Sequence, residues 1–264
     1  MNTTLPTPEA PSGERHEAGC AVLVLEFANE IPRRSLEAVL PEGPSVVRHR
    51  IDPLANPALL VGPHPVAEQA AHWLGESALS EGPLLVVAYC SGAVLAQALA
   101  EAWPGQSSVL LLDPADLGPD DPQALLVELA RKLDGGVDLA NLPELRGRTE
   151  AAAFDAARSF LVEVLTAVAP DLPAPIAESL VGKQLAWFSY GLAASAHETR
   201  VRQPTRVFLS EGIACSPPWA GARVEMLPLP QAELFTADAV RTAAEEAVAV
   251  LTAAHLGALP EAVA

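Results

Sequence analysis

The sequence predicts an α/β fold in which a mostly parallel central sheet is covered by helices on both faces. The first observation behind this prediction is that short apolar runs alternate along the chain with longer stretches of helical periodicity. The second is composition, because 50% of the 264 residues are hydrophobic, which is enough to bury one large core. The third is that only 19% of the residues are charged, which excludes a disordered chain.

Six short apolar runs are the predicted strands, and helical segments separate most of them, as parallel pairing requires. The predicted strands cover residues 20–27, 45–51, 83–88, 107–113, 204–210 and 222–227. The segments with helical periodicity cover residues 33–40, 66–79, 93–103, 122–133, 150–168, 176–196 and 238–251.

The stretch from about residue 117 to 199 contains no strand signal. It is too long for one crossover helix, so it is predicted as a helical insertion placed after a strand end. Lids over active sites commonly lie at such positions. Residues 1–19 are polar and contain several prolines, and they are predicted to form a flexible tail. Residues 20–264 then form one domain.

Charge and cysteine content exclude several kinds of protein. The chain has 16 Lys and Arg against 33 Asp and Glu, a formal charge of -17, and such a chain repels nucleic-acid phosphates. It lacks both the ~20-residue apolar run of a membrane-spanning helix and the apolar core of a signal peptide. A soluble, cytoplasmic protein is therefore expected. Cys20, Cys90 and Cys215 are too far apart for a readable disulfide framework or metal site, so neither metal nor cofactor is expected.

One strand-to-helix junction has the pattern of a nucleophile elbow. In Ala88-Tyr89-Cys90-Ser91-Gly92, small residues stand two before and two after Cys90, as in the usual G-x-S-x-G, with alanine replacing the first glycine. A helix N-terminus lowers the pKa of a thiol, and the Ser91 N–H can donate to an oxyanion. The alternative is that Cys90 is a small buried residue. If Ser91 were the nucleophile, the small residues would be out of register.

Residues 82–101, GPLLVVAYCSGAVLAQALAE, resemble the elbow of the thioesterase domains and type II thioesterases of polyketide and nonribosomal peptide assembly lines. Some of these enzymes use cysteine as the nucleophile. The similarity in order and spacing extends from Cys20 to Leu251. The resemblance implies an α/β-hydrolase fold with a helical lid, and an acyl thioester substrate held on an acyl or peptidyl carrier protein.

The partners that a catalytic triad requires are incomplete. The resemblance places the acid at Asp113 or at Glu211, although a strand-end aspartate before a proline is equally often structural. The position of the family's histidine is occupied by Glu233. A carboxylate with a pKa near 4.3 is a poor base for a thiol near 8.5. His64 lies on a loop at the same sheet edge as the elbow and is the one other candidate base.

The oxyanion loop also departs from the family pattern, because residues 26–32 contain no glycine. The backbone N–H of Phe27 or Ala28, or the side-chain amide of Asn29, could replace the expected donor. Aromatic residues near the elbow and in the insertion are candidates either for core packing or for an acyl channel. They include Tyr89, Trp187, Phe188 and Tyr190.

Three functions from different classes remain open. The first is acyl transfer, cyclisation or release through Cys90. The second is a non-covalent cyclase or lyase in the same pocket, with Glu233 as acid and base. The third is a noncatalytic partner of a carrier protein. Basic residues in or next to the insertion could attract an acidic carrier, or could be scattered solubilising charges. They are Arg131, Lys132, Arg146, Arg148, Lys183, Arg200 and Arg202.

Overall fold

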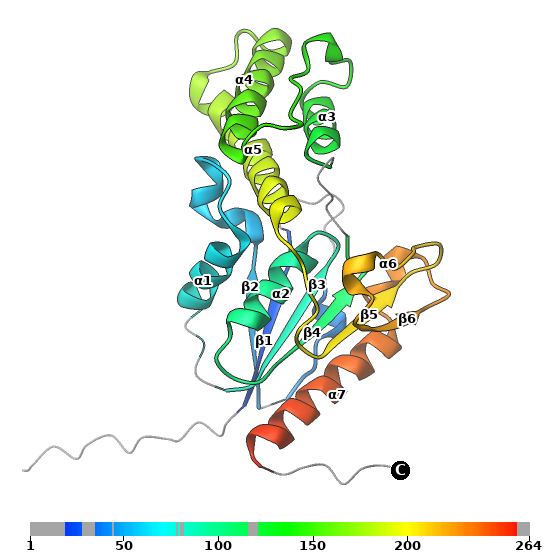
Figure 1. The fold of residues 1–264 in the computed structure, drawn as a ribbon. Helices are drawn as coiled ribbons and strands as arrows, with labels where there is room; N and C mark the ends of the chain where they lie inside the picture. Colours follow the sequence, from blue (N-terminus) through cyan, green and yellow to red (C-terminus); the bar gives the residue numbers. More distant parts are fainter. Residues whose placement is uncertain are drawn as a thin grey trace, which may run out of the picture.

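The computed structural model of the chain describes residues 19–27, 35–43, 45–77, 79, 82–115 and 121–257. Its centre is a six-stranded sheet with the order β2-β1-β3-β4-β5-β6, and every strand pairs in parallel with its neighbours (Figure 1). The strands are β1 Cys20–Leu25, β2 Val46–Ile51, β3 Leu84–Tyr89, β4 Ser107–Leu112, β5 Thr205–Leu209 and β6 Arg223–Met226. This architecture confirms the predicted α/β class.

The strand sequences explain which strands lie in the centre. All six residues of β3 are buried, as expected for a parallel strand covered on both faces. By contrast, β2 and β6 at the two ends of the sheet are largely exposed or half-buried. The chain runs from β1 outward to β2 and then returns to β3 on the other side of β1. The carboxyl ends of β1 and β3 therefore flank the switch point, where open α/β sheets bind their ligands.

Helices cover both faces of the sheet. They are α1 Val66–Glu76, α2 Gly92–Ala102 and α7 Asp238–His255. The Gln97 amide on α2 donates to the Thr205 hydroxyl at 3.0 Å, whereas the adjacent Arg206 pairs with Glu246 on α7 at 2.6 Å. Because successive strand residues face opposite sides, α2 and α7 lie on opposite faces.

Three helices form an insertion between β4 and β5. They are α3 Asp121–Leu133, α4 Glu150–Val168 and α5 Ala174–Ala196. In Figure 1 the insertion stands beyond the carboxyl ends of the strands, and the C-terminal part of α5 reaches down to the sheet. The insertion has its own hydrophobic cluster, separate from the main core, and Trp187 contacts both. None of the described helices has the length and apolar character needed to cross a bilayer.

The predicted elements agree closely with the observed ones, except where elements are very short. The predicted helix at 33–40 is wrong in the described part, where only Glu37–Val39 forms a 3-10 turn. The loop after β2 contains two unpredicted 3-10 turns, Pro53–Ala55 and Pro57–Leu60. Asp52 and Asn56 each stand directly before the proline that begins a turn. Their side-chain oxygens accept the backbone N–H of Leu54 and of Ala58, respectively. A four-residue helix, α6 Gln231–Leu234, was also not predicted. The predicted tail lies almost wholly outside the described residues.

Candidate active site

Cys90 occupies a strained turn between β3 and α2. Its φ is 49°, a left-handed backbone that residues other than glycine adopt rarely. The Cys90 N–H donates to the Leu112 carbonyl at 3.0 Å, and the Cys90 carbonyl accepts from Ala93 at 3.2 Å and from Ala115 at 3.1 Å. These three bonds hold the strained conformation. The side chain of Cys90 is half-buried at the edge of the main core.

Close packing around the turn explains the small residues on either side of Cys90. A Cβ atom added to Gly92 would lie 3.5 Å from the Cβ of Ala88 and 3.6 Å from the ring of Phe27. An alanine would make ordinary contacts here, and a larger side chain would meet the strand. Ser91 precedes the first helical residue, where backbone N–H groups have no acceptor inside the helix.

Five aromatic side chains surround the turn and are called the aromatic cluster below. Its members are Phe27, Tyr89, Trp187, Tyr190 and Phe235. The ring of Phe27 stacks on Trp187 at 4.6 Å between centroids, and the Tyr89 ring meets Phe235 edge-on at 5.2 Å. The cluster therefore joins the end of β1, the turn, the insertion and the segment after β6.

Tyr190 links the insertion directly to the turn. Its hydroxyl donates a 2.8 Å hydrogen bond to the carbonyl of Ser91, and both groups are buried. Burial raises the pKa of the Tyr190 phenol, and the charge of a nearby Cys90 thiolate raises it further. Tyr190 thus stays protonated and keeps donating across the neutral range.

Asp113 stands at the end of β4, next to the turn, and is engaged on both oxygens. Its Oδ1 accepts from the Ser210 N–H and its Oδ2 from the Ser210 hydroxyl, each at 2.7 Å. The carboxylate is buried, and its backbone also has positive φ, 42°. Asp113 therefore joins the carboxyl ends of β4 and β5. The serine partner lies 97 residues away and had no sequence signal.

In the segment after β6, the ring of Phe235 packs against Tyr89 at the end of β3, and the carboxylate of Glu233 does not. Glu233 lies on α6 with its side chain exposed, whereas Leu234 and Phe235 are buried. Glu211, the other acid that the resemblance suggested, is exposed on the loop after β5. Sequence reasoning missed Phe235, although its place two residues after the expected histidine position was a usable signal.

The described histidines lie on several different elements. His64 is in the loop before α1, where its Nδ1 lies 3.5 Å from Glu68, and its side chain is 30% exposed. His49 is on β2, two strands from β3, and His72 is on α1 against Trp73. His197 follows α5, and His255 is the last residue of α7.

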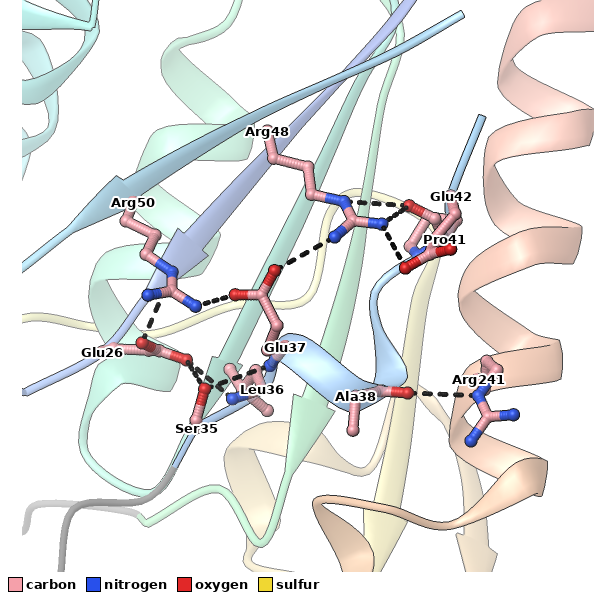
Figure 2. Close-up of polar contacts among 10 residues, drawn as sticks. All are labelled: Glu26, Ser35, Leu36, Glu37, Ala38, Pro41, Glu42, Arg48, Arg50 and Arg241. Carbon is pink, nitrogen blue, oxygen red and sulfur yellow. Dashed lines mark hydrogen bonds and ion pairs between the residues drawn. The ribbon is translucent and has the colours of Figure 1, made fainter. Parts of the chain in front are cut away.

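Of the predicted oxyanion donors, Phe27 is buried two residues after the end of β1, and Ala28 and Asn29 lie outside the described residues. The adjacent Glu26 is buried, and its Oε1 accepts the Leu36 N–H at 2.6 Å. Figure 2 shows how Arg50 lies between Glu26 and Glu37. Glu26 thereby fastens the chain immediately after β1 to the described segment that begins at Ser35.

Among the described residues, two cavities border the insertion helices, and Cys90 lines neither of them. The larger, about 740 Å³, is bounded by α3, the loop at residues 144–148, α4 and the end of α5. The smaller, about 380 Å³, lies between α4, α5 and Leu60. Phe188 is buried inside the insertion's own cluster, whereas Trp187 and Tyr190 face the turn.

The basic residues of the insertion are partly neutralised. Lys132 pairs with Glu128, Arg200 with Glu198 and Arg202 with Glu101. In the described part of the chain, His, Cys, Asp and Glu side chains do not gather in threes as a metal site requires.

No protein-family model matches the chain, and no curated protein matches it. Solved structures match it. The NocB thioesterase domain, in a covalent complex with a fluorophosphonate nocardicin G analogue, is 18% identical, with 91% of this chain and 96% of that chain covered and a TM-score of 0.48. RedJ with a PEG molecule in its active site is 14% identical, with 93% and 96% covered and a TM-score of 0.43.

The bottromycin epimerase BotH, in complex with bottromycin A2, is also similar. It is 13% identical, with 89% of this chain and 91% of that chain covered and a TM-score of 0.49. Thioesterase domains are thus among the structural neighbours, as the resemblance implied. Likeness at this level does not define an activity.

Proposed function

We propose that the protein processes acyl thioesters of the polyketide or peptide type through Cys90, by transfer, cyclisation or release. The observation that carries the proposal is the turn itself. A residue with a left-handed backbone at the end of a central strand, followed at once by a helix, is how α/β-hydrolases expose a nucleophile. The strain is of the kind that functional sites retain.

The chemistry needs a thiolate more than a strong base. The Cys90 thiolate attacks the thioester carbonyl carbon, the bond from that carbon to the donor sulfur breaks, and the donor leaves as a thiolate that takes up the proton lost by Cys90. This exchange between thiols and thioesters is nearly balanced in energy. A nucleophile then attacks the Cys90 thioester, and its proton returns to the Cys90 sulfur.

The first turn of α2 supports this step, because its backbone N–H groups favour both the thiolate and the developing oxyanion. The aromatic cluster makes the surroundings of the turn apolar, and its half-buried member Trp187 is the ring that an acyl group would contact. An acidic carrier protein is the expected bearer of that acyl group, and it would have to approach a chain of charge -17.

Intact mass spectrometry with a short acyl N-acetylcysteamine thioester tests the proposal. We expect one acyl adduct, or turnover, in the native protein and in Cys215→Ala, whose thiol is exposed and serves as the control. Cys90→Ala should remove both. Turnover that survives Cys90→Ala unchanged would rule out covalent catalysis.

A second candidate is non-covalent chemistry in the same place, favoured because Glu233, at the position of the family's histidine, has an exposed side chain. A covalent triad needs a base that contacts the nucleophile and is itself oriented by an acid. In this case products form without an adduct, and Cys90→Ala retains turnover. Glu233→Gln then tests whether the exposed carboxylate acts as acid or base.

A further inference from the structure

One end of the sheet is an open strand edge. β6 pairs with β5 on one side, and no described strand lies on its other side. Two of its apolar side chains are exposed: Val224 is 38% and Met226 63% exposed. In Figure 1 β6 is the terminal strand, beside β5. A free edge presents unpaired N–H and C=O groups to any strand that can align with it.

The register identifies which groups are free. The Leu227 N–H donates to the Leu209 carbonyl, so Leu227 points its backbone groups at β5. Backbone groups alternate direction along a strand, so Arg223 and Glu225 also face β5. The N–H and C=O groups of Val224 and Met226 therefore point outward, away from the sheet.

We propose that β6 pairs in antiparallel fashion with β6 of a second copy of this chain, about a two-fold axis at Val224. Each Val224 would then exchange two backbone hydrogen bonds with its symmetry mate. The Met226 N–H would donate to the Ala222 carbonyl of the second copy. An isologous contact of this kind closes after two chains and continues the sheet from one copy into the other.

Charge complementarity indicates that the strand pairing with the free edge of β6 comes from a second copy of the chain. With Val224 on the axis, Arg223 stands directly opposite Glu225 of the second copy, and the pair occurs twice. Arg223 is exposed and forms no ion pair with any described residue. Glu225 lies 3.8 Å from Arg206 and its side chain is 40% exposed, so its carboxylate is accessible to a cation of the second copy. On the opposite face Val224 meets Val224, and Met226 meets Ala222, which covers the exposed apolar side chains.

The strand is only four residues long, so the contact is small compared with a permanent dimer interface. Each copy also carries a charge of -17, and salt at about 0.15 M screens that repulsion over about 8 Å. We therefore expect a concentration-dependent dimer with a micromolar dissociation constant.

Sedimentation equilibrium of the full chain at 0.15 M salt tests the proposal through charge reversal. Arg223→Glu and Glu225→Arg should each weaken dimerisation at least tenfold, because like charges then face each other. The double variant Arg223→Glu/Glu225→Arg should restore the native constant to within about threefold. Thermal unfolding at low concentration shows whether each variant is folded.

Val224→Pro removes the outward N–H on the axis and should abolish the dimer. Val47→Lys is the matched control, because Val47 is 54% exposed on β2 at the other end of the sheet and should leave the dimer unchanged. A native chain that stays monomeric at 200 μM would overturn the proposal. So would a dimer that the single charge reversals leave intact, or one that the double variant fails to restore.

Discussion

Two adjacent strands are each followed by a residue with a left-handed backbone conformation. The two residue types differ in how well they tolerate that conformation. Cys90 follows β3 and Asp113 follows β4, with φ values of 49° and 42°. Aspartate enters this region more readily than most residues, whereas cysteine has no such preference. The strain at Cys90 therefore has to be offset by its surroundings. The backbone hydrogen bonds to Leu112, Ala93 and Ala115 stabilise the strained conformation.

The Asp113–Ser210 contact predicts a graded loss of stability. Asp113→Ala leaves a buried Ser210 N–H without its acceptor and should lower the free energy of unfolding by about 3 kcal/mol. Asp113→Asn keeps an acceptor and tolerates positive φ, so it should cost about 1 kcal/mol. Urea unfolding at pH 7 measures both. Equal losses in the two variants would show that the acceptor contributes little.

Cys20 predicts a specific loss of stability at alkaline pH. Burial raises the pKa of this thiol from 9.0 to about 11. Between these values the folded chain retains a proton that the unfolded chain releases. The contribution of Cys20 is thus complete below pH 9 and falls as the pH rises to 11, by about 3 kcal/mol in all.

Urea unfolding of the native chain and of Cys20→Val between pH 8 and 11.5 tests this prediction. Tyr190 also has a raised pKa and adds its own alkaline loss in both proteins, so the difference between them isolates Cys20. Parallel pH profiles would contradict the prediction.

At the scale of elements, the sequence predicted the strands and helices whose apolar pattern lies within the element itself. The strands and longer helices were found because the apolar pattern covers at least six residues of the sequence at each of their positions. The 3-10 turns after β2 and the helix α6 are only three or four residues long, about one helical turn, so the pattern does not repeat within them and they were missed. The same limit applies to the site, since the four residues of α6 decide that Phe235 turns inward and Glu233 outward.

The contacts between residues far apart in the sequence had no local signal either. The turn at Cys90 was predictable because its small neighbours lie within two residues. The Ser210 partner of Asp113 and the Tyr190 partner of Ser91 are 97 and 99 residues away in sequence. Such pairs depend on the order of the strands in the sheet and on where the insertion packs against it. The residues around Cys90 indicate neither of these.

The ion pair between Arg50 and Glu26, just after β1, should contribute to the stability of the fold. Arg50 pairs with Glu26, which is 4% exposed, and Arg50→Ala would leave that buried carboxylate without its opposite charge. We expect a loss of about 2 kcal/mol, less than for a fully buried pair because Arg50 is itself 45% exposed.

The control is Arg200→Ala, which removes a solvent-exposed pair with Glu198 and should leave the stability nearly unchanged. Arg50→Ala/Glu26→Gln should recover part of the loss, because no charge is then buried. Thermal unfolding of the four proteins checks this, and equal effects of the two single variants would contradict it.

At the scale of the whole molecule, the described residues form two hydrophobic cores of unequal size. The main core surrounds the sheet and includes α2 and α7, whereas the insertion packs α3 and α4 against α5 in a smaller cluster. The link between them runs through α5, where Trp187 stacks on Phe27 and Tyr190 bonds to Ser91. Local opening of the insertion would therefore expose the aromatic cluster without unfolding the sheet.

Native-state hydrogen exchange should resolve these two cores. We expect amides in the middle of β3 to exchange only by global unfolding, because every residue of that strand is buried between layers. Amides in the middle of α4 should open at a cost at least 2 kcal/mol lower, since α4 packs on the other insertion helices and not on the sheet. The helix α7 is the internal control, because it is similar in length and contacts β1, β3 and β4 directly. Equal opening free energies for α4 and β3 would mean that the insertion and the sheet unfold as one cooperative unit, and that the site opens only when the whole fold does.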